Sequence, residues 1–167
     1  MAKEITIRMS TASINDAIKE LRRMKEDFER KLDLFVRMLA NDGVQIALME
    51  IRSAVADTHN ADIELTIDSK QDIVSATIRM FGEDRLFIEF GAGFYYNPSD
   101  PPHASQYNMG VGTFPGQTHA FDIGWWYTDK DGKSRYTHGT QATSPMLQAS
   151  NNYRNNAILM ALQLFRS

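Results

Sequence analysis

The N-terminal third of the chain repeats apolar residues at intervals of three and four, from Ile14 to Val55. This spacing places them on one face of an α-helix, with charged residues on the opposite face. Ser13 followed by Asp16 resembles a capping box, which predicts the start of the helix. Asn41-Asp-Gly43 combines a capping residue with a glycine, so a break or kink is expected there. The pattern predicts either one long helix or a helical hairpin folded at Asn41–Gly43.

The long-helix alternative has a consequence for assembly. A straight helix from Ser13 to about Asp57 would be roughly 60 Å long at 1.5 Å per residue. That length exceeds what the core of a chain of 167 residues needs. A helix that extends beyond its own core usually has a partner, so this alternative indicates oligomerisation.

Beyond residue 60 the apolar period changes from helical spacing to two. Ile63–Ile67, Val74–Met80 and Leu86–Phe90 each alternate apolar and polar residues, which is typical of β-strands with one buried face. Because short turns separate the three segments, they are predicted to form an antiparallel meander. Near the C-terminus, Ser144-Pro145 forms an N-cap and first-turn pair, which predicts a last helix.

Residues 94–137 differ from the rest of the chain. The first part is rich in Gly, Pro, Asn and aromatic residues, and such long irregular loops tend to be functional or mobile. The second part predicts a hairpin of Ile123–Thr128 and Lys133–Thr137 with a turn at Asp131-Gly132. Strand alternation requires at least one of Trp125 and Trp126 to face inward.

These elements predict an α+β fold in a single domain, residues 1–167. It has a long N-terminal helical segment, a small antiparallel sheet of about four or five strands, and a C-terminal helix packed on the sheet. Hydrophobic residues make up 43 % and charged residues 23 %, values that argue against wholesale disorder.

Charge and composition remove several function classes. The formal net charge of -3 gives no general attraction to nucleic acid or anionic lipid. The absence of cysteine excludes disulfides, thiolate nucleophiles and cysteine metal sites. No apolar run approaches the roughly 18 residues of a membrane span, so no membrane partner is expected.

The candidates for catalysis are weak. The four histidines, His59, His103, His119 and His138, lack the spacing of a metal site. Asp129-Lys-Asp-Gly132 resembles the start of a calcium loop, but Thr140 stands where the loop needs an acid. We therefore expect no enzyme, no metal and no cofactor.

The concentration of aromatic residues between residues 94 and 127 is the most unusual feature of the composition. Tyr, Trp and Phe are enriched at protein–protein interfaces, so an interface is favoured over purely internal packing. The candidate interface residues are Phe94, Tyr95, Tyr96, Tyr107, Phe114, Trp125 and Trp126.

Two segments carry a resemblance to a known family. One is Glu89-Phe90-Gly91 at the end of a predicted strand. The other is Gly139-Thr-Gln-Ala142-Thr-Ser-Pro145-Met146, which leads into the C-terminal helix. Both are similar to motifs of the tail-completion, or head–tail joining (neck), proteins of long-tailed bacteriophages, often called minor tail proteins. This chain has one extra residue before the proline, and Met146 replaces an aromatic residue.

The resemblance implies a structural virion protein, located at the neck and assembled in the cytoplasm of the host bacterium. Its partners would be copies of itself, in a ring of about six, and neighbouring neck, tail-terminator or tail-tube proteins. It implies neither catalysis nor specific nucleic-acid binding. Two alternatives stay open: a small histidine- or metal-dependent hydrolase, and an interaction module that binds a host protein.

Glu89 is the one acid within an apolar segment, and a buried acid needs hydrogen-bond partners. We expect its carboxylate to accept hydrogen bonds from backbone N–H groups or an arginine. These donors are expected near Gly91–Gly93 or Thr137–Thr140. Glu89 would then fix the point where the aromatic loop leaves the sheet.

Overall fold

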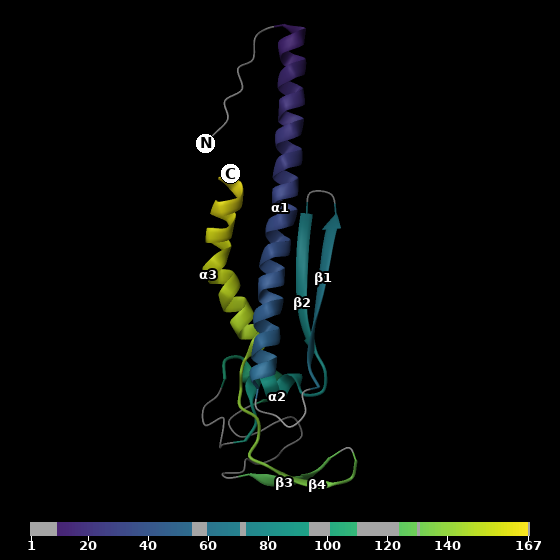
Figure 1. Cartoon of the computed structure of the whole chain (residues 1–167), viewed down its shortest axis with the longest axis vertical. Coiled ribbons are helices and arrows are strands. Elements are labelled where there is room, and N and C mark those ends of the chain that lie inside the picture. The colour runs from purple at the N-terminus through teal and green to yellow at the C-terminus, as the bar shows by residue number, and fades with distance from the viewer. Residues whose placement is uncertain are drawn as a thin grey trace.

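A computed structural model describes residues 10–54, 60–70, 73–93, 101–109, 124–129 and 131–166. One long helix forms the axis of the molecule, with a β-hairpin along one side and the C-terminal helix along the other (Figure 1). A second, shorter hairpin lies beyond the C-terminal end of the long helix. In chain order the elements are α1 (Thr11–Ser53), β1 (Asp62–Lys70), β2 (Ile73–Phe81), α2 (Arg85–Phe90), the 3-10 helix η1 (Ala104–Tyr107), β3 (Trp125–Thr128), β4 (Ser134–Thr137) and α3 (Pro145–Phe165).

The N-terminal helical segment is one continuous helix, so the hairpin alternative is wrong. The predicted start is also wrong by three residues. Ser10 is the N-cap, and its hydroxyl accepts a hydrogen bond from the backbone N–H of Ser13 at 3.3 Å. An N-cap side chain that reaches the third helical residue satisfies one of the unpaired N–H groups at a helix start.

Gly43 does not break α1 because it packs against α3. A Cβ atom added at Gly43 would lie 2.1 Å from the hydroxyl oxygen of Tyr153. Glycine therefore lets the ring of Tyr153 approach the helix backbone. Ala40 and Ala47 are also buried, and such small residues let two helices come close.

The strands β1 and β2 form the first hairpin, as the alternation predicts. They pair antiparallel over their full length, from Asp62 opposite Phe81 to Lys70 opposite Ile73. Apart from Ile73 and Phe81 at the two ends of β2, which are exposed, the apolar side chains of the hairpin face α1 and are partly buried, while the polar ones are exposed.

The predicted third strand, Leu86–Phe90, is instead the short helix α2. Ile88, Glu89 and Phe90 are all buried, so this segment has no solvent-facing side that a strand alternation would need. Ile88 contacts the cluster of Ile51 and Ala54 at the end of α1, and Phe90 belongs to a second cluster. The molecule therefore has two separate two-stranded sheets among the described residues, fewer strands than predicted.

The C-terminal helix α3 packs on α1 rather than on the sheet, which corrects the predicted arrangement. The two helices run antiparallel, as Figure 1 shows. The ring of Phe165 lies 5.5 Å from that of Phe28 and 6.2 Å from that of Phe35. The hairpin and α3 thus cover different sides of α1.

The second hairpin, β3–β4, confirms the prediction for this segment. Asp129 organises the connection: its carboxylate accepts hydrogen bonds from the N–H groups of Asp131 and Lys133 and from Arg135. The carboxylate therefore serves a turn, and the resemblance to a calcium loop has no structural counterpart. Within the described part of the chain, no helix is apolar and long enough to cross a membrane.

Candidate functional site

Glu89 is bound to the start of α3. One carboxylate oxygen accepts a hydrogen bond from the N–H of Met146 at 2.9 Å, and the other accepts one from Leu147 at 3.1 Å. The donors are free backbone groups of the first helical turn, where the helix dipole also favours a negative charge. The prediction that Glu89 accepts backbone hydrogen bonds is confirmed, but its donors lie at the start of α3 rather than in the two segments expected.

Ser144 occupies the N-cap position of α3 but does not cap it with its side chain. Its backbone is left-handed, at φ 51° and ψ 54°. Its hydroxyl instead donates a hydrogen bond to the carbonyl oxygen of Glu89 at 2.9 Å. The start of α3 is therefore capped by the side chain of Glu89, which is far away in the sequence. The prediction that the side chain of Ser144 caps the helix is wrong.

Further contacts connect the segments Ile88–Ala92 and Gly139–Leu147. We call these two connected segments the joint. The N–H of Thr143 donates to the carbonyl of Ile88 at 3.0 Å, and Ala92 and Thr140 form an isolated antiparallel bridge. Gly139 is required at this bridge because it has a φ of 96° and an added Cβ would lie 1.8 Å from the carbonyl oxygen of Ala92. Both segments that carry the family resemblance therefore belong to one structural unit.

Other motif residues also have structural roles in the joint. Gly91 ends α2 with a φ of 74°, and Pro145 is fully buried at the first position of α3. Phe90 stacks on Tyr107 with ring centroids 5.1 Å apart. Ala142 is half-buried.

Burial dominates the ionisation of Glu89, which is 8 % exposed. Desolvation raises the pKa of its carboxyl above the ordinary value, and the hydrogen bonds from Met146 and Leu147 offset part of that rise. Each carboxylate oxygen already holds a backbone N–H, so the group is committed to the joint.

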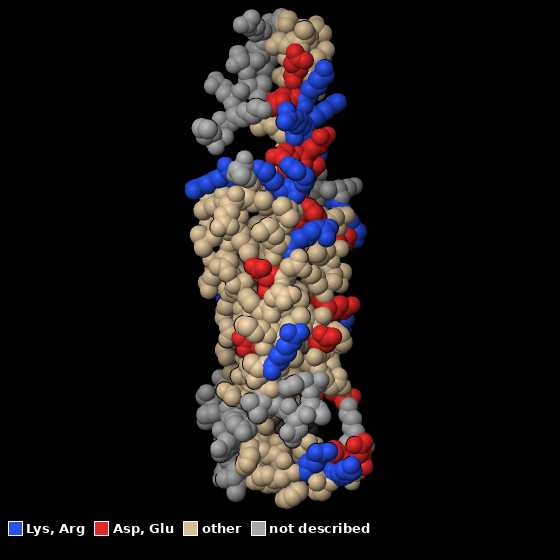
Figure 2. All heavy atoms as spheres, viewed as in Figure 1, with Lys and Arg blue, Asp and Glu red and all other residues tan. Residues whose placement is uncertain are grey.

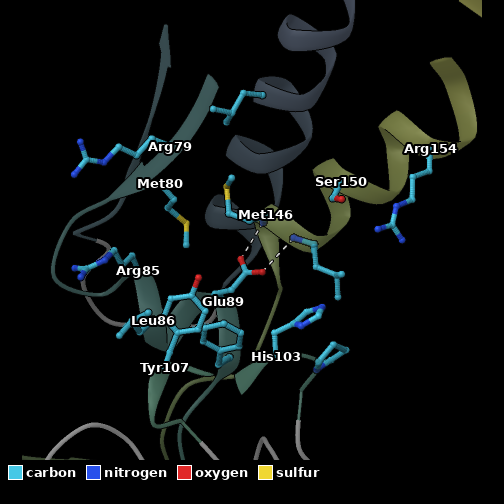
Figure 3. A pocket seen from close by; sticks show the side chains of 14 residues that line it. Arg79, Met80, Arg85, Leu86, Glu89, His103, Tyr107, Met146, Ser150 and Arg154 are labelled. Atoms are coloured by element: carbon cyan, nitrogen blue, oxygen red, sulfur yellow. Dashed lines mark hydrogen bonds between the residues drawn. The ribbon is translucent and has the colours of Figure 1, made fainter. Parts of the chain in front are cut away.

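A pocket of about 480 Å³ opens next to the joint, between β2, α2, η1 and the start of α3. Its apolar wall is formed by Met80, Leu86, Phe90, Met146 and Leu147. In Figure 3, Arg79 and Arg85 lie on one side of the pocket with their guanidinium groups pointing away from it, and Arg154 lies on the other side. His103 and Tyr107 lie on the η1 side.

The exposed charged residues in the pocket lining are all positive. All three arginines are exposed, and Glu89, the acid in the lining, is bound to backbone N–H groups. Within the described part of the chain, no carboxylate forms an ion pair with Arg79, Arg85 or Arg154. An apolar pocket with Arg154 at its edge is complementary to an apolar side chain beside a carboxylate.

The candidate interface aromatics fall into three groups. Phe94, Tyr95, Tyr96 and Phe114 lie outside the described residues. Tyr107 lines the pocket and is 52 % exposed. In β3, Trp125 is half-buried and contacts Gly93, whereas Trp126 is 68 % exposed and packs edge-on against Tyr136. The prediction that at least one tryptophan faces inward is confirmed.

The histidines do not come together in the part of the chain that can be described. His103 lines the pocket, and His138 packs against Tyr136 at the second hairpin. His59 and His119 lie outside the described residues. No group of three His, Asp or Glu side chains that could hold a metal ion occurs among the residues the structure describes.

Sequence reasoning missed the arginines of the pocket. Arg79, Arg85 and Arg154 come from β2, α2 and α3, and each looks like an ordinary exposed residue of its own element. Arg154 alone carried a signal, because it is the single charged residue in α3.

No protein-family model matches this chain, and no curated protein or solved structure matches it.

Proposed function

We propose that this chain is a structural virion protein of a long-tailed bacteriophage or prophage, which completes the tail end and joins the tail to the head. It acts as one subunit of a ring at the neck, with about six copies. The protein assembles in the bacterial cytoplasm and remains in the virion. It binds other proteins and needs no cofactor or catalysis.

The observation that carries this proposal is the joint. Glu89-Phe-Gly91 and the Gly139–Pro145 segment are far apart in the sequence, yet Glu89 binds the first turn of α3 directly. A resemblance based on two separate short motifs gains weight when both motifs meet in one structural unit. Their residues serve folding geometry, as expected of a family defined by assembly rather than by chemistry.

The surface supports an assembly role. The outer side of α3 exposes Ile158, Leu159 and Leu162, and the helix contains a single charged residue, Arg154. Figure 2 shows that much of the middle of one face, over α3 and α1, is uncharged. Exposed apolar surface of this kind marks protein–protein contacts.

The pocket supplies the second contact in this proposal. A neighbouring neck or tail protein would insert an apolar side chain against Met80 and Leu86, and an adjacent carboxylate would meet Arg154. The uncharged side of α3 would instead face the next copy in the ring. The two surfaces thus separate partner binding from self-association.

Two observations test the proposal. The coding sequence should lie among genes for portal, major capsid and tail-tube proteins. The purified chain should bind a neighbouring head-closure or tail-tube protein in sedimentation velocity. A setting among unrelated genes, together with no binding to either class of protein, would overturn it.

A further inference from the structure

The N-terminal part of α1 projects beyond the other described elements (Figure 1). On one side, α3 reaches α1 at Phe28 through the ring of Phe165. On the other, the tip of the β1–β2 hairpin reaches Asp33, whose carboxylate accepts a hydrogen bond from Ser69 at 3.3 Å. The segment Thr11–Asp27 is therefore about 25 Å of helix, at 1.5 Å per residue, that α3 and the hairpin do not cover.

This projecting segment carries an exposed apolar stripe. Its members are between 38 % and 56 % exposed, although their side chains are large. Within the segment the stripe comprises Ile14, Ile18, Leu21 and Met24, and Phe28 continues it at the point where the ring of Phe165 from α3 reaches α1. Ala17, at the first d position of the same face, is a small residue that is already buried. A row of large apolar side chains exposed on a helix indicates a helical partner.

The stripe follows a seven-residue repeat. Ile14, Leu21 and Phe28 are seven residues apart, and Met24 follows Leu21 by three. These are the a and d positions of a coiled coil, in which helices pack with their apolar seams together. Glu20 then occupies a g position and Lys25 an e position, one on each side of the seam.

The charges beside the seam decide the orientation of a partner helix. In a parallel pair of identical helices, a g residue faces the e residue five positions later in the other copy, so Glu20 would face Lys25 in both directions. In an antiparallel pair, g residues face g residues, and Glu20 would meet the acid Asp27. Opposite charges at e and g positions favour the parallel pair.

We infer that the projecting segment of α1 pairs in parallel with the same segment of a second copy of this chain, along the seam of Ile14, Leu21, Met24 and Phe28. This inference does not depend on the neck proposal. The pair uses the same seam on both copies, so it is a two-fold contact that closes at a dimer and is distinct from the contact that would repeat around a ring. Because the seam covers about two heptads, where a stable coiled coil needs about three or four, the contact on its own is weak and reversible.

Disulfide trapping tests this arrangement directly because the chain contains no cysteine. In a parallel pair, position 21 lies next to its own copy across the seam. Leu21→Cys should therefore give a disulfide-linked dimer under mild oxidation. The matched control is Lys19→Cys, on the same helix but opposite the seam, with a Lys19 side chain that is 80 % exposed. Equal, slow cross-linking of the two variants would overturn the inference.

A charge exchange tests the orientation without a covalent link. Over a concentration series in sedimentation equilibrium, Glu20→Lys should raise the dimer dissociation constant about tenfold, since it places like charges beside each other in both pairs. The double variant Glu20→Lys/Lys25→Glu should restore the original value. A wild-type chain that stays monomeric throughout the series, or a double variant no better than the single one, contradicts parallel pairing. Leu21→Asp should abolish the dimer while far-UV circular dichroism shows that the helix is retained.

Discussion

The carboxylate of Glu89 accepts a hydrogen bond of 2.9 Å from the backbone N–H of Met146, across 57 positions of sequence. This contact ties the short helix α2 to the start of α3. Because α3 packs along α1, the same contact fixes the pocket relative to the axis of the molecule.

Glu89→Gln should weaken the joint. An amide can accept one backbone N–H but places its own NH₂ group against the other, which leaves a buried donor unsatisfied. We expect the free energy of unfolding at neutral pH to fall by about 1–3 kcal/mol. Urea denaturation followed by circular dichroism measures this change.

The matched control is Glu26→Gln on the exposed surface of α1. It should change the free energy of unfolding by less than about 0.5 kcal/mol. If Glu89→Gln is as stable as this control and assembles normally, Glu89 does not hold the joint.

Stability should depend on pH through the same group. Burial raises the pKa of Glu89 in the folded state. Between the ordinary carboxyl pKa and this raised pKa, the folded chain binds a proton that the unfolded chain has released. The contribution of Glu89 to stability is therefore complete below the ordinary pKa and decreases as the pH rises through the raised one.

Comparison with Glu89→Gln isolates this effect from other carboxyl groups. The difference in the free energy of unfolding between the wild type and the variant should be largest at acidic pH. It should shrink as the pH rises toward neutrality. A difference that grows with pH would mean that the folded-state pKa is lowered instead.

Gly43→Ala should destabilise the protein, although alanine favours helices by about 1 kcal/mol over glycine. The added methyl group would lie within 2.7 Å of three atoms of Tyr153, so α1 and α3 would have to separate. Overpacking of this kind costs about 1–3 kcal/mol. Asn41→Ala, at an exposed position two residues away, should be neutral or slightly stabilising in the same urea titration. A more stable Gly43→Ala would show that the helices do not need this close approach.

Sequence patterns predicted the elements that are long or strictly periodic. The long helix and the β1–β2 hairpin follow from apolar spacing, since each buries one face, and the Ser144-Pro145 pair predicted α3. The segment Leu86–Phe90 is too short for its alternation to separate a strand from a helix. The segment forms a helix because it packs against the end of α1, where Ile88 contacts Ile51 and Ala54. This packing depends on the tertiary structure and cannot be read from the local sequence.

The joint could be predicted only in part. An acid in an apolar segment required hydrogen-bond donors, and that requirement was met. The identity of the donors depends on how α3 is placed, which the local sequence around Glu89 does not encode. Ser144-Pro145 correctly marked the start of α3, but the left-handed backbone of Ser144 turned its side chain toward Glu89 instead.

The pocket predicts a charge requirement for partner binding. Arg154→Glu should weaken binding of a neck or tail partner about tenfold, because it places a negative charge at the rim that receives carboxylates. The fold should be unaffected, since the side chain is exposed. Arg23→Glu, which makes the same change in charge on the projecting part of α1, is the control. Equal loss of affinity in both variants would indicate a general charge effect and not a site.

The central claim is that this chain joins tail to head, and sedimentation velocity tests it most directly. The purified chain should be measured alone and mixed with the head-closure and tail-tube proteins encoded beside it. We expect a ring-sized species that co-sediments with at least one of them. A chain that forms no ring under any condition and sediments unchanged in both mixtures would show that it does not join tail to head.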